Sequence, residues 1–225
     1  QGPDPTPERL AELEAIAVDF TSAHAADDRG TPMLARVLDL GRDADPALVI
    51  ERAERLLARP DVAAFPDSLH MARDLLAHAH FDLGDFAVAE ALYGDLLADP
   101  DLDPGLRDGY ENRRIVSIQR QAQLAEASAR AAAEAAGEAG AGTPDFEPAL
   151  FHLQRLAQVP GQVGVGARRD AIALLLESGA QASAIAAIEA YRTEIGQDEA
   201  WRGLSLALAG LYEQTGAWPE AATLW

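Results

Sequence analysis

The chain has 225 residues, 48% of them hydrophobic, which is enough for one large helical domain or two small ones. Its net charge of −19, from 37 acidic and 18 basic residues, disfavours nucleic acid and anionic membranes as partners, because both would repel it. The absence of cysteine excludes disulfides, thiolate metal sites and cysteine nucleophiles.

The N-terminal part, residues 4–104, is predicted to be a row of helices. Residues 1–3 match the end of a protease tag site and are set aside as a tag remnant. Proline or aspartate opens each later segment, and glycine or proline closes it, as expected at helix ends. The predicted helices are one from Thr6–Pro7, one over 33–40 capped by Thr31–Pro32, one from Asp45–Pro46 to Pro60, one from Asp67 to Leu83, and one from the Gly84–Asp85 turn to Pro100.

Residues 105–139 are predicted to form one long helix, about 50 Å in length. Apolar residues recur there at steps of three and four, which is a heptad pattern. One interpretation is a solvated connector, and the other is a projecting arm that packs on a partner or on a second copy. A glycine-rich hinge follows over 137–142. The heptad positions are Ile115, Ile118, Ala122, Ala125, Ala129, Ala132 and Ala136.

The C-terminal part, residues 143–225, is predicted to hold a helix from Thr143–Pro144 to Gln158 and two further helix pairs. The pairs turn at Gly179 and Gly216. The glycine-rich stretch 161–166 is interpreted as a flexible loop, with an anion cradle as the alternative. No segment alternates as a strand would, so the chain is predicted to be all-α.

Two segments resemble the tetratricopeptide repeat (TPR), a pair of short helices joined by a tight turn. The first, at about 67–99, has small residues at Ala77 and Ala89 on either side of Gly84. The second has Ala209 and Ala221 around Gly216, and a weaker copy surrounds Gly179. Aromatic residues at the positions that fill gaps between pairs complete the pattern: Phe86, Tyr93, Tyr212, Trp218 and Trp225.

The resemblance implies an irregular α-solenoid of antiparallel helix pairs with one long central helix. Arg73, Arg168 and Ser205 replace the usual tryptophan, and Ile172 replaces a small residue. The turn glycines at 179 and 216 are 37 residues apart, against a usual period of ~34. The pattern also implies that the last repeat continues beyond residue 225.

By the same resemblance, the first helix of each pair lines a groove that receives a partner peptide or helix. The expected partner is a basic or neutral protein, since the chain is acidic. The positions carried over to this groove are Asp74, His78, Phe81, Asp82, Arg169, Ala173, Glu177, Leu206, Gly210, Glu213 and Gln214.

No pattern predicts catalysis, a metal or a cofactor. His70 and His78 share a helix stripe with Asp74, but they are two turns apart, ~12 Å, which is too far to share one ion. The spacing Asp99-x-Asp101-x-Asp103 lacks the glycine and glutamate of a calcium loop. No serine lies in a nucleophile elbow.

The sequence therefore predicts a protein-interaction scaffold that is not an enzyme. One alternative is an oligomeric structural component that associates through 105–139. Another is a non-catalytic regulatory part of a larger enzyme or sensor. The arginine-only basic residues suggest a bacterial origin, and the composition favours a periplasmic location within an envelope assembly, with the cytoplasm as the alternative.

Overall fold

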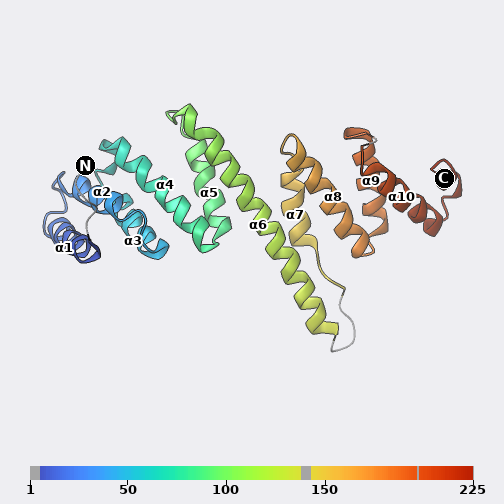
Figure 1. Ribbon diagram of the computed structural model, residues 1–225, viewed down its shortest axis with the longest axis horizontal. Helices are drawn as coiled ribbons and strands as arrows, with labels where there is room; N and C mark the ends of the chain where they lie inside the picture. The colour runs from blue at the N-terminus through green and yellow to red at the C-terminus, as the bar shows by residue number, and fades with distance from the viewer. Residues whose placement is uncertain (1–5, 138–142, 197, 225) are drawn as a thin grey trace. The chain divides into compact units, whose positions relative to one another are not determined.

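The computed structural model describes residues 6–137, 143–196 and 198–224. Across these residues every regular element is a helix and there is no strand, which confirms the all-α prediction (Figure 1). The predicted tag remnant, most of the hinge at 137–142 and Trp225 lie outside the described residues. The elements are α1 Pro7–Ala23, α2 Gly30–Leu40, α3 Pro46–Leu57, the 3₁₀ turn η1 Val62–Ala64, α4 Pro66–Leu83, α5 Phe86–Leu97, α6 Pro104–Gly137, α7 Glu147–Leu156, α8 Gln162–Glu177, α9 Gln181–Glu194, α10 Trp201–Thr215 and α11 Trp218–Ala222.

The chain divides into two compact units, residues 1–117 and 118–225, and the division falls within α6. In the first unit each helix packs on the next along the chain, with α4 against both α3 and α5 (Figure 1). Leu38, Ala53, Leu56 and Ala72 are fully buried between α2, α3 and α4. Each buried leucine contributes about 1.5–3 kcal/mol through removal of apolar surface from water.

Charged side chains also hold the first unit together. Arg52 of α3 is 8% exposed, and its Nε and Nη2 donate to one carboxylate oxygen of Glu14 on α1, at 3.0 and 2.7 Å. Arg59 donates to backbone carbonyls in the loop before α2 and to the side chain of Asp61. Arg59 is tolerated in this buried position because its Nε, Nη1 and Nη2 all donate, whereas Arg52 keeps one buried nitrogen, Nη1, without a hydrogen-bond partner among the described residues.

Helices α4, α8 and α10 end in the same way. Gly84, Gly179 and Gly216 have φ values of +85°, +71° and +78°. At Gly84 the backbone N–H donates to the carbonyl of Phe81, and the following N–H reaches back to His80. The same two bonds recur at the other two glycines, so all three turns are Schellman caps. The predicted turn positions are confirmed, because only glycine adopts this conformation without steric cost.

The small residues predicted at helix crossings are buried. Ala77, Ala89 and Ala209 are 0% exposed and Ala221 is 3% exposed, as expected where a larger side chain would push the helices apart. The aromatic prediction holds for Tyr93, which is fully buried. It was wrong for Trp218, which is 64% exposed because no described helix packs over the start of α11.

The predicted loop at 161–166 is instead the first turns of α8. Gly161 has a φ of +78° and ends the loop, and the helix starts at Gln162. A Cβ on Gly164 would lie 2.1 Å from the carbonyl oxygen of Val159. This glycine therefore lets α8 start close against the end of α7, and does not make the segment flexible.

Two predicted helix starts were displaced. The helix predicted from Thr143–Pro144 starts at Glu147, where the carboxylate of Asp145 accepts the Glu147 N–H at 3.0 Å. The helix predicted from residue 33 starts at Gly30. Thr31 does not cap it, because its hydroxyl is fully buried and donates to Asp61 Oδ1 at 2.7 Å.

Helix α6 covers Pro104–Gly137 of the predicted 105–139, of which 138 and 139 lie outside the described residues, and its heptad positions are covered unevenly. Ile118, Ala122 and Ala129 are buried, whereas Ala132 and Ala136 are exposed. In the second unit, the last turns of α6 extend past the ends of α7 and α8 (Figure 1). The packed part of the pattern therefore ends near residue 130, and the part beyond it is an exposed, alanine-rich end.

Candidate functional site

The predicted groove residues of α4 lie in a polar and aromatic cluster with α5 and α6. His78 Nδ1 is 2.9 Å from the backbone carbonyl oxygen of Asp74 and 3.0 Å from its Oδ1. The Tyr110 hydroxyl donates to the Asp74 carboxylate and lies 3.1 Å from His70 Nε2. Tyr93 is fully buried and meets the His78 ring edge-on, with centroids 5.8 Å apart. Helix α4 is thereby fixed against its neighbours.

The charges of this cluster stabilise one another. Burial alone would raise the pKa of Asp74, but hydrogen bonding to His78 and the charge of His78 outweigh it, so that pKa is lowered. The Asp74 carboxylate in turn raises the pKa of His78. Burial raises the pKa of Tyr93 to about 12. The arrangement favours an Asp74–His78 ion pair and a neutral tyrosine, which is a packing role.

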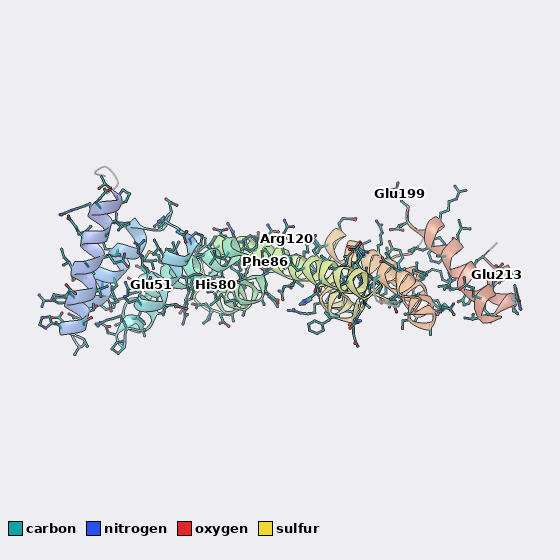
Figure 2. All side chains as sticks on the ribbon, turned by 90° about the horizontal axis from the view of Figure 1, so that it is seen from below. Glu51, His80, Phe86, Arg120, Glu199 and Glu213 are labelled. Carbon is teal, nitrogen blue, oxygen red and sulfur yellow. The ribbon has the colours of Figure 1, made fainter. Side chains whose placement is uncertain are left out.

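The other two predicted residues of α4 differ in exposure. Phe81 meets Phe86 edge to face at 5.5 Å, and the Arg113 guanidinium lies 5.7 Å from the Phe81 ring centroid. Figure 2 labels Phe86 near the turn between α4 and α5. Asp82 is exposed. Of the four residues predicted on α4, Asp82 is therefore the one with its charge in solvent.

The predicted residues of α8 are held by neighbouring elements. Arg169 donates to the Tyr191 hydroxyl at 2.8 Å and to Asp198 at 2.5 Å, and Tyr191 also donates to Asp198 at 2.6 Å. Glu177 accepts two hydrogen bonds from Arg130 of α6, at 3.2 and 2.7 Å. Both charges thus take part in contacts within the second unit.

A groove between α8, α9 and α10 contains several of the predicted residues. It has a volume of about 330 Å³, and we call it the α8–α10 groove. Leu206 on its wall is 49% exposed, and the space beside Gly210 is open. Gln181 donates to Gln214 across one end at 2.8 Å. The structure therefore places Leu206, Gly210 and Gln214 together, whereas Glu213 does not line this groove.

A second groove, of about 250 Å³, lies between α6, α7 and α8, and we call it the α6–α8 groove. Its floor is apolar, and its walls carry three glutamines and two carboxylates. The lining residues are Gln119, Ala122, Gln123, Glu126, Leu153, Leu156, Gln162, Val163, Gly166, Ala167 and Asp170. The sequence interpretation missed this groove, although Gln119, Gln123 and Glu126 recur at steps of four and three on one face of α6.

The two carboxylates of the α6–α8 groove are not equivalent. Glu126 pairs with Arg130 at 2.5 Å. Asp170 forms no ion pair or hydrogen bond with any residue that the structure describes. Although Asp170 is an exposed residue, partial burial raises the pKa of its carboxyl group, and the negative charge of Glu126 raises it further, against a smaller opposing effect of Arg169. A carboxylate in this position feels the charge of Arg169 but has no ion-pair partner among the described residues.

The largest of the grooves described here, about 640 Å³, lies between α7 and α9 over α8. Phe151 at its edge is 57% exposed. Ala186, Ala187 and Ala190 form the opposite wall, and Ile172 lies in the floor. Its lining is mostly apolar, and Glu147, Gln154 and Arg168 are among the few polar side chains that could orient a small ligand.

No family model matches the chain, and neither a curated protein nor a solved structure matches it significantly. Among the described residues, no cluster of histidine and carboxylate side chains could hold a metal ion. Within the same residues, no helix is both long and apolar enough to cross a bilayer.

Proposed function

We propose that this chain is a protein-binding scaffold of tetratricopeptide-like helix pairs, and that it binds a segment of a partner protein on the exposed face of α8. The observation that carries the proposal is the pair of grooves that α8 shares with its neighbours. Gly166 and Asp170 line the α6–α8 groove, and Leu176 lines the α8–α10 groove. Ala173 is exposed and lies between these residues along α8.

The turns support the repeat assignment within this proposal. Helices α4, α8 and α10 are the predicted first helices, and all three end in the same glycine cap. Stacked helix pairs of this kind leave a row of first helices exposed to a partner. An irregular α-solenoid is the arrangement that we propose for the whole set.

The charge of the chain supports a protein partner that is basic or neutral. Eleven arginines face 24 acidic residues in 1–117, a net charge of −13, and seven face 13 in 118–225, a net charge of −6. Complementary charge increases the rate and specificity of association. The proposed role involves no catalysis, cofactor, nucleic acid or direct membrane contact, and the periplasmic location stays a prediction.

Site-specific photocrosslinking tests the proposal. A benzophenone amino acid at Ala173 is expected to crosslink a discrete partner in the native host, which mass spectrometry then identifies. The same probe at Ala91, an exposed position of α5, serves as the matched control. Equal crosslinking at both positions, or none at Ala173, would overturn the proposal.

Self-association through α6 is the second candidate function. Its support is the exposed end of α6, from Ala131 to Gly137, of which only Ala133 is partly covered. Light scattering over a range of concentrations separates the two functions. A mass near 24 kDa at every concentration removes self-association, and a dimer that glutamate substitutions at Ala132 and Ala136 abolish supports it.

A further inference from the structure

The chemistry of the two grooves on α8 points to the kind of segment that fits them, and this inference rests on the proposed function. The α6–α8 groove contains an unpaired carboxylate, Asp170, above an apolar floor. The neighbouring Glu126 is paired with Arg130, but its charge still adds to the negative potential at Asp170. The groove thus offers a site for one positive charge with an apolar stem, which is the shape of an arginine or lysine side chain.

The walls of the α6–α8 groove favour an extended peptide. Gln119 and Gln123 lie on α6, and Gln162 lies on α8, so amides line both sides. Each amide can donate and accept a hydrogen bond, which suits the backbone of an extended chain. Their placement fits a peptide better than a lone cation, which would need only oxygen ligands.

The α8–α10 groove takes an apolar side chain. Leu206 and Leu176 on its walls are 49% and 36% exposed, and a methyl group on Gly210 would meet no atom within 4 Å. Burying the two leucines under an apolar side chain would remove their surface from water. The Gln181–Gln214 hydrogen bond closes one end of this groove, so its polar groups are already paired.

The spacing of the two grooves sets the spacing of the two side chains. Asp170 and Leu176 are six residues apart on α8, or ~9 Å along the axis. A helix is ~10 Å wide, so the grooves on its two sides are ~13 Å apart. An extended chain covers ~3.3 Å per residue, and about four residues therefore span this distance.

We propose that the partner segment is an extended peptide with an arginine or lysine that pairs with Asp170 in the α6–α8 groove. An apolar residue about four positions away occupies the α8–α10 groove. The side-chain amides of Gln119, Gln123 and Gln162 bind the peptide backbone between α6 and α8.

A random 12-residue peptide library displayed on phage tests this inference with the full chain as bait. Peptides selected on the wild type are expected to share a basic residue about four positions from an apolar one. Asp170→Asn should remove the basic preference and keep the apolar one. Leu206→Ser should remove the apolar preference and keep the basic one. Glu199→Gln makes the same change of charge at an exposed position outside both grooves (Figure 2), and should select the wild-type peptides.

Affinity measurements then test whether the basic residue of the peptide pairs with Asp170. For a selected peptide, fluorescence anisotropy should give a dissociation constant about five- to tenfold weaker with Asp170→Asn, and unchanged with Glu199→Gln. Circular dichroism checks that each variant is folded. Enriched peptides with no basic preference, or an Asp170→Asn variant that binds as the wild type does, would overturn this inference alone. A library that yields no enriched peptide would also count against the proposed function.

Discussion

At the scale of single residues, the Asp74–His78 pair makes the stability of the first unit depend on pH. The pKa of His78 is raised, because the Asp74 carboxylate stabilises its charged form. Tyr93 and Tyr110 face the pair from α5 and α6, and the positive charge of Arg113 opposes the shift. The contribution of His78 to folding is therefore complete below its unfolded pKa of ~6.5, and is lost as the pH rises through the higher folded value.

The variant His78→Gln is expected to lose this pH dependence. Between pH 6 and pH 9, the free energy of unfolding in urea should fall by about 0.3–1 kcal/mol more in the wild type than in His78→Gln. The expected difference is small because the side chains of His78 and Asp74 are each 30% exposed, and water screens the pair. His24→Gln changes an exposed histidine at the end of α1 and should leave the wild-type dependence intact. Identical pH dependence in the wild type and His78→Gln would contradict this account.

The ionised carboxylate of Asp170 is expected to lower the free energy of unfolding slightly at pH 7. Its pKa is raised in the folded chain, so the folded state binds the proton more tightly than the unfolded state does. Stability from this group therefore falls as the pH rises through its carboxylate range. Asp170→Asn should raise the melting temperature a little at pH 7, with a gain below about 0.5 kcal/mol. A melting temperature that falls would show that Asp170 has a stabilising partner.

At the scale of elements, the start of α8 depends on one glycine. Gly164→Ala would place a methyl group 2.1 Å from the carbonyl oxygen of Val159, so the start of α8 and the turn that follows α7 would have to move apart. We expect a loss of about 1–3 kcal/mol in urea unfolding, the usual cost of overpacking. Gly166→Ala is the matched control on the same helix, since its methyl group would meet no atom within 4 Å. The control should gain about 0.5–1 kcal/mol, and equal effects of both changes would refute the assignment.

Most helix ends could be predicted from the sequence, since local chemistry determines them. The αL turns at Gly84 and Gly216 need glycine wherever they are placed, so the residue type identified them. The start of α8 could not be predicted in this way. Gly164 is needed because the turn between α7 and α8 folds back until the carbonyl oxygen of Val159 lies against it, and the residue types of this stretch do not reveal how tightly the turn closes.

The candidate site was predicted less well than the fold, for a related reason. Positions carried over from the repeat pattern identify a helix face only if each helix keeps the same rotation. Asp74 lies on the chosen face of α4, yet Tyr110 from α6 covers its carboxylate. Asp170 is one residue from the predicted Arg169, and it is the residue that lines a groove. The helices that pack on α8 determine whether Arg169 or Asp170 lines the groove. The sequence of α8 alone does not reveal which helices those are.

At the scale of the whole molecule, the net charge of −19 opposes folding, since it concentrates like charges in a smaller volume. Salt has two opposite effects on such a chain. It weakens exposed ion pairs such as Arg9–Glu12, which contribute little, and it screens the general repulsion. The repulsion is the larger effect here, because the acidic residues outnumber the basic ones by 19.

The melting temperature is therefore expected to rise by roughly 2–5 °C when NaCl increases from 20 to ~500 mM, which corresponds to about 1 kcal/mol. Circular dichroism at 222 nm measures it, and a series with KCl should match, because screening depends on ionic strength and hardly on the cation. Binding of the proposed basic segment should respond in the opposite direction and weaken with salt, since its attraction to Asp170 is screened by the same ions. A melting temperature that falls over this range would mean that specific ion pairs, such as Arg52–Glu14, outweigh the repulsion between the remaining carboxylates.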